Sequence, residues 1–333
     1  MKIIRTTLSL LICLLMCASA ALASDLTTNG GTVIPEEALP WCVEDEAAPI
    51  VYFTGDISAD SLVKIYEALG VDLPGRVGVK LSTGESEKSN YLRPELIADL
   101  EHLVNGTLVE CNTAYGGNRA STAVHRQQAR DNGLLDVAEL DILDEDGSME
   151  IPVDGGVRID VDYVGSHFAD YDSFLVLSHF KGHAMAGFGG AIKNISIGFA
   201  SSMGKGWIHS GGTRTSGNIW GEQDAFLEAM ADAAKGVDTY MDGSIVYISV
   251  LNRLSVDCDC DGRPAEPDMH DIGILASTDP LAIDQAAVDL VYAMPDSSSL
   301  VRRIESRNGL HTLESGEAIG LGSRFYRLVN LDD

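Results

Sequence analysis

From residue 50 onward, short runs rich in β-branched residues alternate with longer segments whose apolar residues recur at helical spacing. Strands separated by helices can pair in parallel, because each helix returns the chain to the same end of the sheet. We therefore predict an α/β fold with a mainly parallel sheet and helices on both faces. Residues 134–172 break the alternation, and there we predict a small antiparallel insertion. The predicted strands are 50–54, 76–81, 107–111, 174–179, 245–251, 272–276 and an edge strand at 325–331; the predicted helices are 58–69, 93–104, 119–132, 222–235, 280–293 and 297–307.

The N-terminus has the pattern of a secretory signal. Lys2 and Arg5 precede an apolar stretch at 8–16, and a small-x-small cleavage pattern ends at Ala23. We expect residues 1–23 to be removed and the mature protein to be secreted or periplasmic. Cys17 follows the bulky Met16, which disfavours lipid anchoring through that cysteine. Residues 24–48 show no period and predict an extended leader, so residues 49–333 would form a single α/β domain.

The mature chain is strongly acidic. The formal net charge of the whole sequence is −27, and the signal carries two of the cations and none of the acids. Such a surface repels polyanions, which excludes nucleic acid as a general partner. No segment after residue 23 is long and apolar enough to predict a transmembrane segment in the mature chain.

One long stretch contains no acidic residue. Residues 173–221 hold no Asp or Glu, whereas the whole chain has 50, and random placement would produce such a gap roughly once in several thousand windows. Glycines let backbone amides approach a ligand and lysines supply positive charge. In an open α/β sheet, ligands bind at the carboxyl ends of the strands. A Gly-rich buried crossing with outward lysines is the alternative interpretation. The predicted small-anion site comprises Lys80, Asn112, His179, Lys181, His183, Gly189, Gly190 and Lys193.

His179 and His183 are four residues apart and would share a face on a helix, where they could bind a metal. Gly182 and the preceding strand favour a loop instead. Structural, hydrogen-bonded histidines are the alternative.

The segment from Asp257 to Asp268 contains alternating aspartates followed by Gly262, as in a calcium-binding loop. Pro264 and Pro267 exclude the exiting helix of an EF-hand. The interleaved cysteines favour a softer ion such as zinc or iron. An ordinary acidic turn is a further alternative. The predicted metal ligands are Asp257, Cys258, Asp259, Cys260, Asp261 and His270.

Four cysteines remain in the mature chain: Cys42, Cys111, Cys258 and Cys260. The spacing of the last two predicts no bond between their own sulfurs. They would instead pair with other cysteines, bind a metal or remain thiols.

Several ordered strings resemble the family called domain of unknown function 362, over about residues 50–330. Many members carry ferredoxin-type cysteine runs and are labelled iron–sulfur centre proteins. This chain has only Cys258 and Cys260 in the corresponding neighbourhood, which makes a cluster a weaker expectation than a single metal ion. The Gly187–Lys193 string is also similar to a motif of the nickel-pincer lactate racemase family, which implies anion-binding chemistry. The strings that carry the family resemblance are 112–119, 179–183, 189–194 and 271–277, with Asp279-Pro280 and Asp284-Gln285.

No Gly-x-Ser-x-Gly elbow is present, and Cys111 has no base that the sequence identifies. Two hypotheses of different classes follow. The first is a metal- or redox-dependent enzyme acting on a small anionic substrate. The second is a non-catalytic exported protein that holds a metal or an anion.

Overall fold

The computed structural model describes residues 25–332. The predicted signal sequence lies outside these residues. The strands of the described part are β1 (Leu26–Thr27), β2 (Val33–Ile34), β3 (Ile50–Thr54), β4 (Val77–Lys80), β5 (Thr107–Glu110), β6 (Leu140–Ile142), β7 (Ser148–Pro152), β8 (Val161–Gly165), β9 (Ser173–His179), β10 (Lys181–His183), β11 (Gly187–Gly189), β12 (Ile245–Leu251), β13 (Gly273–Ser277) and β14 (Arg327–Asn330). The helices are α1 (Ala59–Ala68), α2 (Pro94–Val104), α3 (Thr122–Asp131), α4 (Ala191–Ser196), α5 (Ser202–His209), α6 (Gln223–Met241), α7 (Pro280–Ala293), α8 (Ser298–Ser306) and α9 (His311–Ile319).

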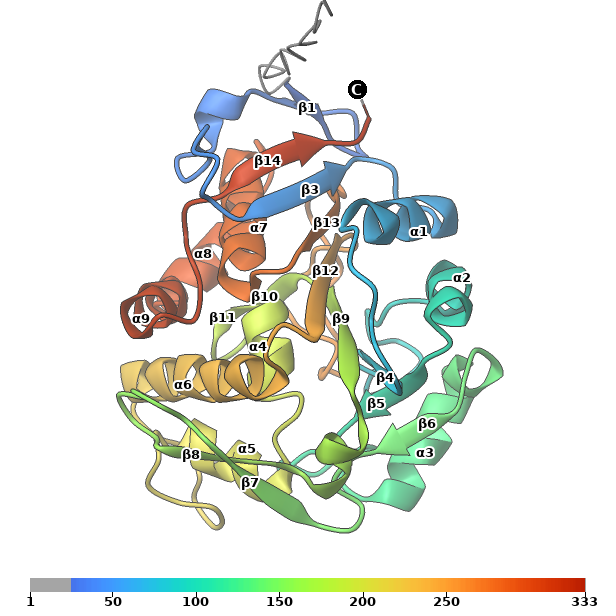
Figure 1. The fold of residues 1–333 in the computed structure, drawn as a ribbon, viewed down its shortest axis with the longest axis vertical. Helices are drawn as coiled ribbons and strands as arrows, with labels where there is room; N and C mark the ends of the chain where they lie inside the picture. The colour runs from blue at the N-terminus through green and yellow to red at the C-terminus, as the bar shows by residue number, and fades with distance from the viewer. Residues whose placement is uncertain (1–24, 333) are drawn as a thin grey trace, which may run out of the picture.

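Within residues 25–332 the main sheet has eight strands in the order β14-β3-β13-β12-β9-β4-β5-β6 (Figure 1). All pairs are parallel except those of β13, which runs antiparallel to both β3 and β12. The α/β fold with a mainly parallel sheet is therefore confirmed. The antiparallel pair β7–β8 confirms the predicted insertion within 134–172.

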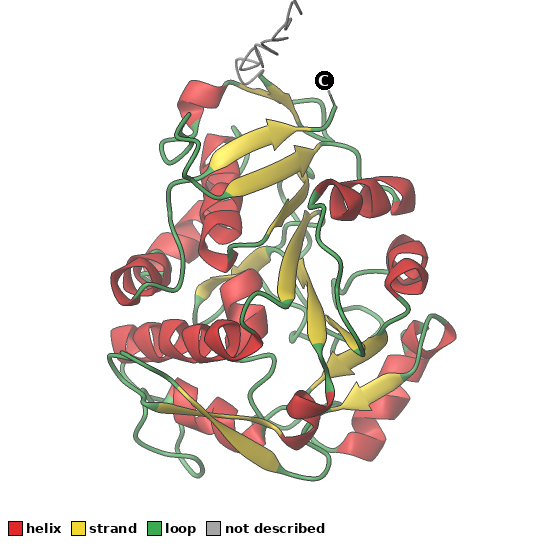
Figure 2. Cartoon of the chain, in the orientation of Figure 1, coloured by secondary structure: helices red, strands yellow, loops and turns green. Residues whose placement is uncertain are grey.

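Helices cover both faces of the sheet, as Figure 2 shows. Strand β9 illustrates why: Phe174 and Val176 belong to one apolar cluster, with α4, α6 and α7, whereas Leu175 and Leu177 belong to another, with α1 and α2. Successive strand side chains point to opposite faces, so a strand that is apolar throughout needs cover on both sides.

The helix caps follow the sequence. Ser58 accepts a hydrogen bond from the amide of Ser61 at the start of α1, and Asp279 accepts from the amides of Leu281 and Ala282 at the start of α7. Both residues accept orphan backbone donors at a helix N-terminus. Three helices were not predicted, namely α4, α5 and α9, nor was the hairpin of β10 and β11.

Residues 25–48 are more ordered than an extended leader. They form the β1–β2 pair and a short 3₁₀ helix, Glu36–Ala38. Leu26, Ile34 and Leu39 are buried in the same apolar cluster as Phe174. The apolar residues of this segment do not recur at helical or strand spacing, because only isolated side chains reach the core. No helix among residues 25–332 has the length and hydropathy needed to span a membrane.

Candidate functional site

A cavity of about 330 Å³ lies at the carboxyl ends of the central parallel strands. Lys80 ends β4, Glu110 ends β5 and His179 ends β9, and all three line it. The hairpin β10–β11, helices α4 and α5 and the 257–262 loop complete its wall. Of the predicted anion-binding residues, the structure brings together Lys80, His179, Lys181, His183, Gly189, Gly190 and Lys193 around this cavity.

Two of the cavity lysines are buried and hydrogen-bonded within the protein. Lys80 Nζ donates to Asn194 Oδ1 and to the carbonyl of Leu81, at 2.9 Å each. Lys181 Nζ donates to Asp259 Oδ1 at 2.7 Å and to the carbonyl of His179 at 3.1 Å. Burial lowers the pKa of each lysine to about 8. These two cations are positioned by the protein itself.

Lys193 differs from both. It projects from α4, and among residues 25–332 no acceptor lies within hydrogen-bond distance of its Nζ. Burial, together with the positive charges of Arg119, Lys80 and Lys181, lowers its pKa to about 7. A cation in this setting gains from any anion that enters the cavity, because the anion supplies the missing partner.

The two acidic groups of the cavity wall are already paired. Glu110 accepts from Arg119 Nη1 at 2.7 Å, from the hydroxyl and amide of Thr83, and contacts His125 at 3.2 Å. Despite its burial, Arg119 and His125 hold the pKa of Glu110 well below its usual range. Asp259 is paired with Lys181 and lies 3.2 Å from His179 Nδ1, and these neighbours lower its pKa. Five cationic side chains against these two acids leave the lining net positive.

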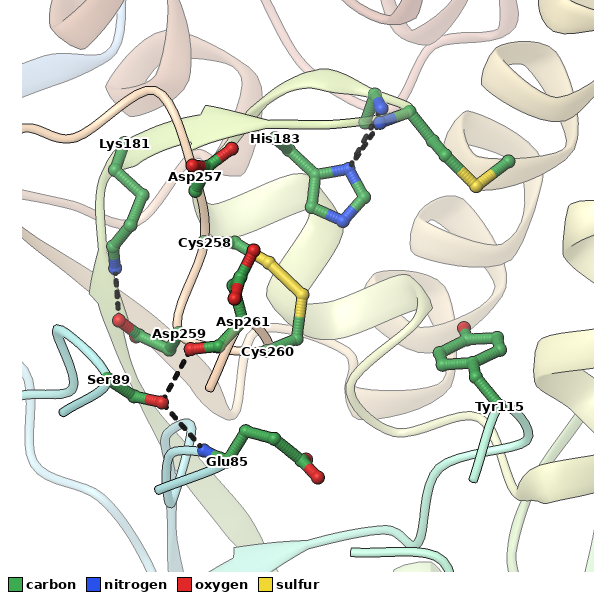
Figure 3. The surroundings of a disulfide bond; sticks show 12 residues. Glu85, Ser89, Tyr115, Lys181, His183, Asp257, Cys258, Asp259, Cys260 and Asp261 are labelled. Atoms are coloured by element: carbon green, nitrogen blue, oxygen red, sulfur yellow. Dashed lines mark hydrogen bonds and ion pairs between the residues drawn. A yellow bond between two sulfur atoms is a disulfide. The ribbon is translucent and has the colours of Figure 1, made fainter. Parts of the chain in front are cut away.

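His183 is positioned by the β10–β11 turn. Its Nδ1 accepts the amides of Met185 and Ala186, at 3.2 and 2.9 Å (Figure 3). Burial and the charge of Lys193 lower its pKa well below the usual value, so the ring is neutral at pH 7. A neutral ring that accepts at Nδ1 carries its proton on Nε2. His183 therefore presents an N–H donor rather than a lone pair.

Aromatic side chains form part of the cavity wall. Tyr115 stacks on Trp220 with ring centroids 5.6 Å apart, and its hydroxyl lies 3.1 Å from His209 Nε2. Burial lowers the pKa of His209 to about 4. These rings offer apolar contact area within the cavity.

The absence of a side chain at the two predicted glycines, Gly189 and Gly190, makes room for neighbouring protein side chains. A Cβ on Gly190 would lie 2.1 Å from Asp284 Oδ1. Oδ1 of Asp284 accepts the amide of Ala191, and Oδ2 accepts the amide of Ile192. The first amides of α4 are thus occupied by a side chain of α7. A Cβ on Gly189 would meet only the stem of Lys193, at 3.3 Å. Asn112 is not among the residues that line the cavity, and its Nδ2 donates to Thr122 Oγ1.

The 257–262 loop differs from the prediction in its cysteines. Cys258 and Cys260 form a disulfide with each other, with their Cα atoms 5.2 Å apart, while Cys42 and Cys111 are free. The expectation that the pair could not bond to itself is wrong. The segment is a turn rather than an extended strand, with the amide of Asp261 donating to the carbonyl of Cys258, and this turn brings the two Cα atoms within bonding range.

The predicted metal ligands separate into two sets. Among residues 25–332, His183, Cys258 and Cys260 have potential ligand atoms within 4.8 Å of one another and form a possible metal-binding group. The other predicted ligands each have a separate partner. Asp257 pairs with Arg303 at 3.2 Å, Asp261 accepts the amide of Arg263, and the exposed His270 contacts Asp296 at 2.7 Å.

The comparisons with known proteins can be set beside this geometry. The family described as domain of unknown function (DUF362) matches residues 77–289, which is more than half of the chain. The chain belongs to this family. The matched range contains every residue that lines the cavity. No curated protein sequence matches the chain.

Solved structures give remote likenesses. The lactate racemase apoprotein from Thermoanaerobacterium thermosaccharolyticum is 12% identical, with a TM-score of 0.43 over 81% of this chain and 62% of that one. A protein from Thermotoga maritima is also 12% identical, with a TM-score of 0.37 over 72% of this chain and 58% of that one. This DUF362 chain thus spans less than two thirds of either protein's length.

The site of this DUF362 protein includes residues that the sequence reasoning did not select. Glu110, Arg119 and Trp220 line the cavity, and so do Lys205 and His209. Glu110 had a visible signal, since it is an acid inside a predicted buried strand and follows two apolar residues. Trp220 had none, because it lies in an irregular segment whose path depends on tertiary contacts.

Proposed function

We propose that this DUF362 protein binds a small organic anion in the cavity, with Lys193 as the cation that pairs with it. The unpartnered Nζ of Lys193 is the observation that carries the proposal. The two acids nearby are neutralised by Arg119 and Lys181, so they do not cancel its charge. A volume of about 330 Å³ suits a metabolite rather than a polymer.

The wall favours an anion that also has an apolar part. Lysines of β4, β10 and α4 line the cavity together with the stacked rings of Tyr115 and Trp220. A carboxylate or phosphate would contact Lys193, and a short carbon skeleton would contact the aromatic rings. His183 also lines the cavity and supplies one neutral donor.

The test is ligand-induced thermal stabilisation of the mature chain. Succinate, sulfate and inorganic phosphate are added to wild type and to Lys193→Met, with replacement of the exposed Lys64 of α1 by Met as the matched control. At 100 times its dissociation constant, an anion should stabilise wild type and Lys64→Met by about 2.7 kcal/mol. Lys193→Met should show no shift on adding anion, and its melting temperature without anion should equal or exceed that of wild type, because an unpaired cation is removed. Stabilisation that survives in Lys193→Met overturns the proposed site.

A soft metal ion bound by His183, Cys258 and Cys260 is a second candidate, favoured by their mutual distances. Nitrogen and sulfur donors suit zinc or iron better than calcium. An iron–sulfur cluster needs about four cysteine ligands, and this group has two. Binding requires the reduced pair and a ring nitrogen free of its proton, because thiolates and neutral imidazole lone pairs are the ligands.

Elemental analysis and an absorption spectrum of protein purified anaerobically, with reductant, test this candidate. Metal should be lost in Cys258→Ser/Cys260→Ser and retained in Asp257→Asn/Asp261→Asn. The opposite pattern would indicate an oxygen-ligated ion. Turnover of a bound anion, or a redox-active chromophore, would separate an enzyme from a binding protein.

We also propose that the protein acts after export. The N-terminal pattern of charge, apolar run and small residues supports this. The intact mass of the exported protein should correspond to a chain that starts at Ser24. A diacylglyceryl mass on Cys17 would contradict it.

A further inference from the structure

The Cys258–Cys260 disulfide lines the anion cavity. Cys260 is exposed and Cys258 is half-buried, so small molecules can reach the bond. The two free cysteines of the described chain are different. Cys111 is buried, with its pKa raised to about 12 by burial, and Cys42 has a pKa raised to about 11 for the same reason. Among these cysteines, the disulfide of Cys258 and Cys260 is therefore the sulfur group that a molecule in the cavity can reach.

The surroundings of the disulfide include His183 and two lysines of the cavity. A ring nitrogen of His183 lies within 4.8 Å of both sulfurs, and the Nδ1 of that ring is occupied by backbone amides (Figure 3). Lys181 and Lys193 line the same cavity. Cations beside a disulfide attract a thiol that carries negative charge.

The loop is held independently of the disulfide. Asp259, between the two cysteines, bonds to Lys181 through its side chain at 2.7 Å and to the amide of Glu85 through its carbonyl at 3.1 Å. Ser89 Oγ donates to the carbonyl of Asp261 at 2.7 Å. Opening the bond therefore leaves both sulfurs at the cavity wall, where the pair can close again (Figure 3).

We propose that Cys258–Cys260 is a redox-active disulfide that exchanges with a small anionic thiol drawn into the cationic cavity. This names a substrate class for the cavity and rests on the anion site proposed above. The thiolate of the small molecule attacks the exposed sulfur of Cys260, the bond between Cys260 and Cys258 breaks, and Cys258 leaves as a thiolate beside His183. A second small thiol attacks the mixed disulfide and releases Cys260. Two thiols are oxidised to one small-molecule disulfide, and their two protons end on Cys258 and Cys260.

Charge-matched thiols provide the test. The oxidised mature chain, freed of metal with a chelator, is reacted with 2-mercaptoethanesulfonate, 2-mercaptoethanol or cysteamine, which are anionic, neutral and cationic. Opening of the disulfide is followed by acid quench, alkylation and intact mass, and each rate is divided by the thiolate concentration. The anionic thiol should react about tenfold or more faster than cysteamine at low salt. The difference should shrink in 0.5 M salt, because salt screens the attraction.

The urea-unfolded chain is the matched control. There the pair is flanked by Asp257, Asp259 and Asp261 without the lysines of the cavity, so the order should reverse in favour of cysteamine. In folded Lys193→Met the rate with 2-mercaptoethanesulfonate should fall more than the rate with 2-mercaptoethanol, because the reacting form of the sulfonate carries one more negative charge. Succinate should slow the anionic thiol in wild type.

The outcomes separate the two proposals. Equal rates for the three thiols in the folded chain, or the same order in folded and unfolded chains, overturn the redox inference. If succinate and sulfate still stabilise that same preparation, the anion site stands and only the inference fails. Anion-induced stabilisation retained in Cys258→Ser/Cys260→Ser, with charge-ordered exchange in wild type, supports both.

Discussion

The lysines at the strand ends and the 257–262 loop meet in one cavity but are held in different ways. Lys80 and Lys181 lie on strands whose backbones pair with β9 and β11. The loop has no such ladder, and its position depends on the Asp259–Lys181 ion pair and on side-chain contacts with residues 85–89. A side chain on a strand thus keeps its place through backbone pairing, whereas one on the loop depends on a few polar contacts.

Replacing Asp259 should produce the largest effect on the loop. In Asp259→Asn the buried Lys181 loses its anionic partner, and His179 loses a neighbour at 3.2 Å. Breaking a buried ion pair from one side costs about 3–5 kcal/mol. We expect the free energy of unfolding, measured in urea at pH 7, to fall by about that amount.

The double variant Asp259→Asn/Lys181→Met is the control for this prediction. Removing both charges should recover much of the loss, because no unpaired cation remains buried. If the single variant costs less than about 1 kcal/mol, the loop is not held by this pair.

On the strand side, Asn194→Ala should have a moderate effect. Asn194 Oδ1 accepts from Lys80 Nζ at 2.9 Å, and its Nδ2 donates to Ser178 Oγ at 3.1 Å. Lys80 keeps the carbonyl of Leu81, so one acceptor is lost rather than all. Leaving buried polar groups short of partners costs about 1–3 kcal/mol, and urea unfolding would measure it. A larger loss than that of Asp259→Asn would show that the strand-end lysines depend more on single polar contacts than the 257–262 loop does.

The difference between backbone-paired strands and the 257–262 loop also explains which features the sequence could predict. Strand β3 begins and ends where the β-branched run does, at Ile50 and Thr54. The residues at the ends of β4 and β9 were accordingly placed on one edge of the sheet, and Lys80 and His179 lie there. The residue pattern is enough to predict where a side chain lies when the backbone has the regular repeat of a strand.

Loops lack that repeat, and there side-chain directions follow from individual contacts. In an extended segment, successive side chains point to opposite sides, so Cys258 and Asp259 would face opposite ways. The chain instead turns at 258–261, and the turn lets Cys258 and Cys260 form a disulfide. Gly190 looked like a residue that admits a ligand, yet the neighbour that fills its space is Asp284, 94 positions away in the chain. Such a contact becomes visible only when α4 and α7 are packed together.

The charge of the wall should make anion binding depend on pH. The pKa of Lys193 is about 7, and those of Lys80 and Lys181 are about 8, all lowered by burial. An anion binds the protonated lysines, so affinity should be highest below pH 7 and fall as pH rises. One obligatory proton on Lys193 gives about a tenfold loss per pH unit above 7, equivalent to about 1.4 kcal/mol. Calorimetric titration with sulfate, whose charge is constant over this range, measures it.

The variant Lys193→Met sharpens this prediction. Any remaining binding should show no fall between pH 6.5 and 7.5 and should weaken only as Lys80 and Lys181 lose their protons near pH 8. An affinity for sulfate that stays constant from pH 6.5 to 8.5 in wild type would show that these three lysines do not contact the anion.

The smallest effect is expected at Asp261, two residues from Asp259 in the same loop. Asp261 is exposed, and its carboxylate accepts the amide of Arg263 at 2.8 Å, whereas the contact of this residue with Ser89 uses the backbone carbonyl. Asp261→Asn keeps an oxygen acceptor and leaves the backbone contact intact, so the free energy of unfolding should change by less than about 0.5 kcal/mol. A calcium loop built from alternating aspartates would instead make Asp257, Asp259 and Asp261 respond alike, with stability in each case depending on added calcium. Urea unfolding of Asp259→Asn and Asp261→Asn, each with calcium and with chelator, therefore compares the two arrangements. Equal losses that calcium removes in wild type would show that the aspartates converge on an ion, and unequal losses independent of calcium would show that Asp259 acts through Lys181.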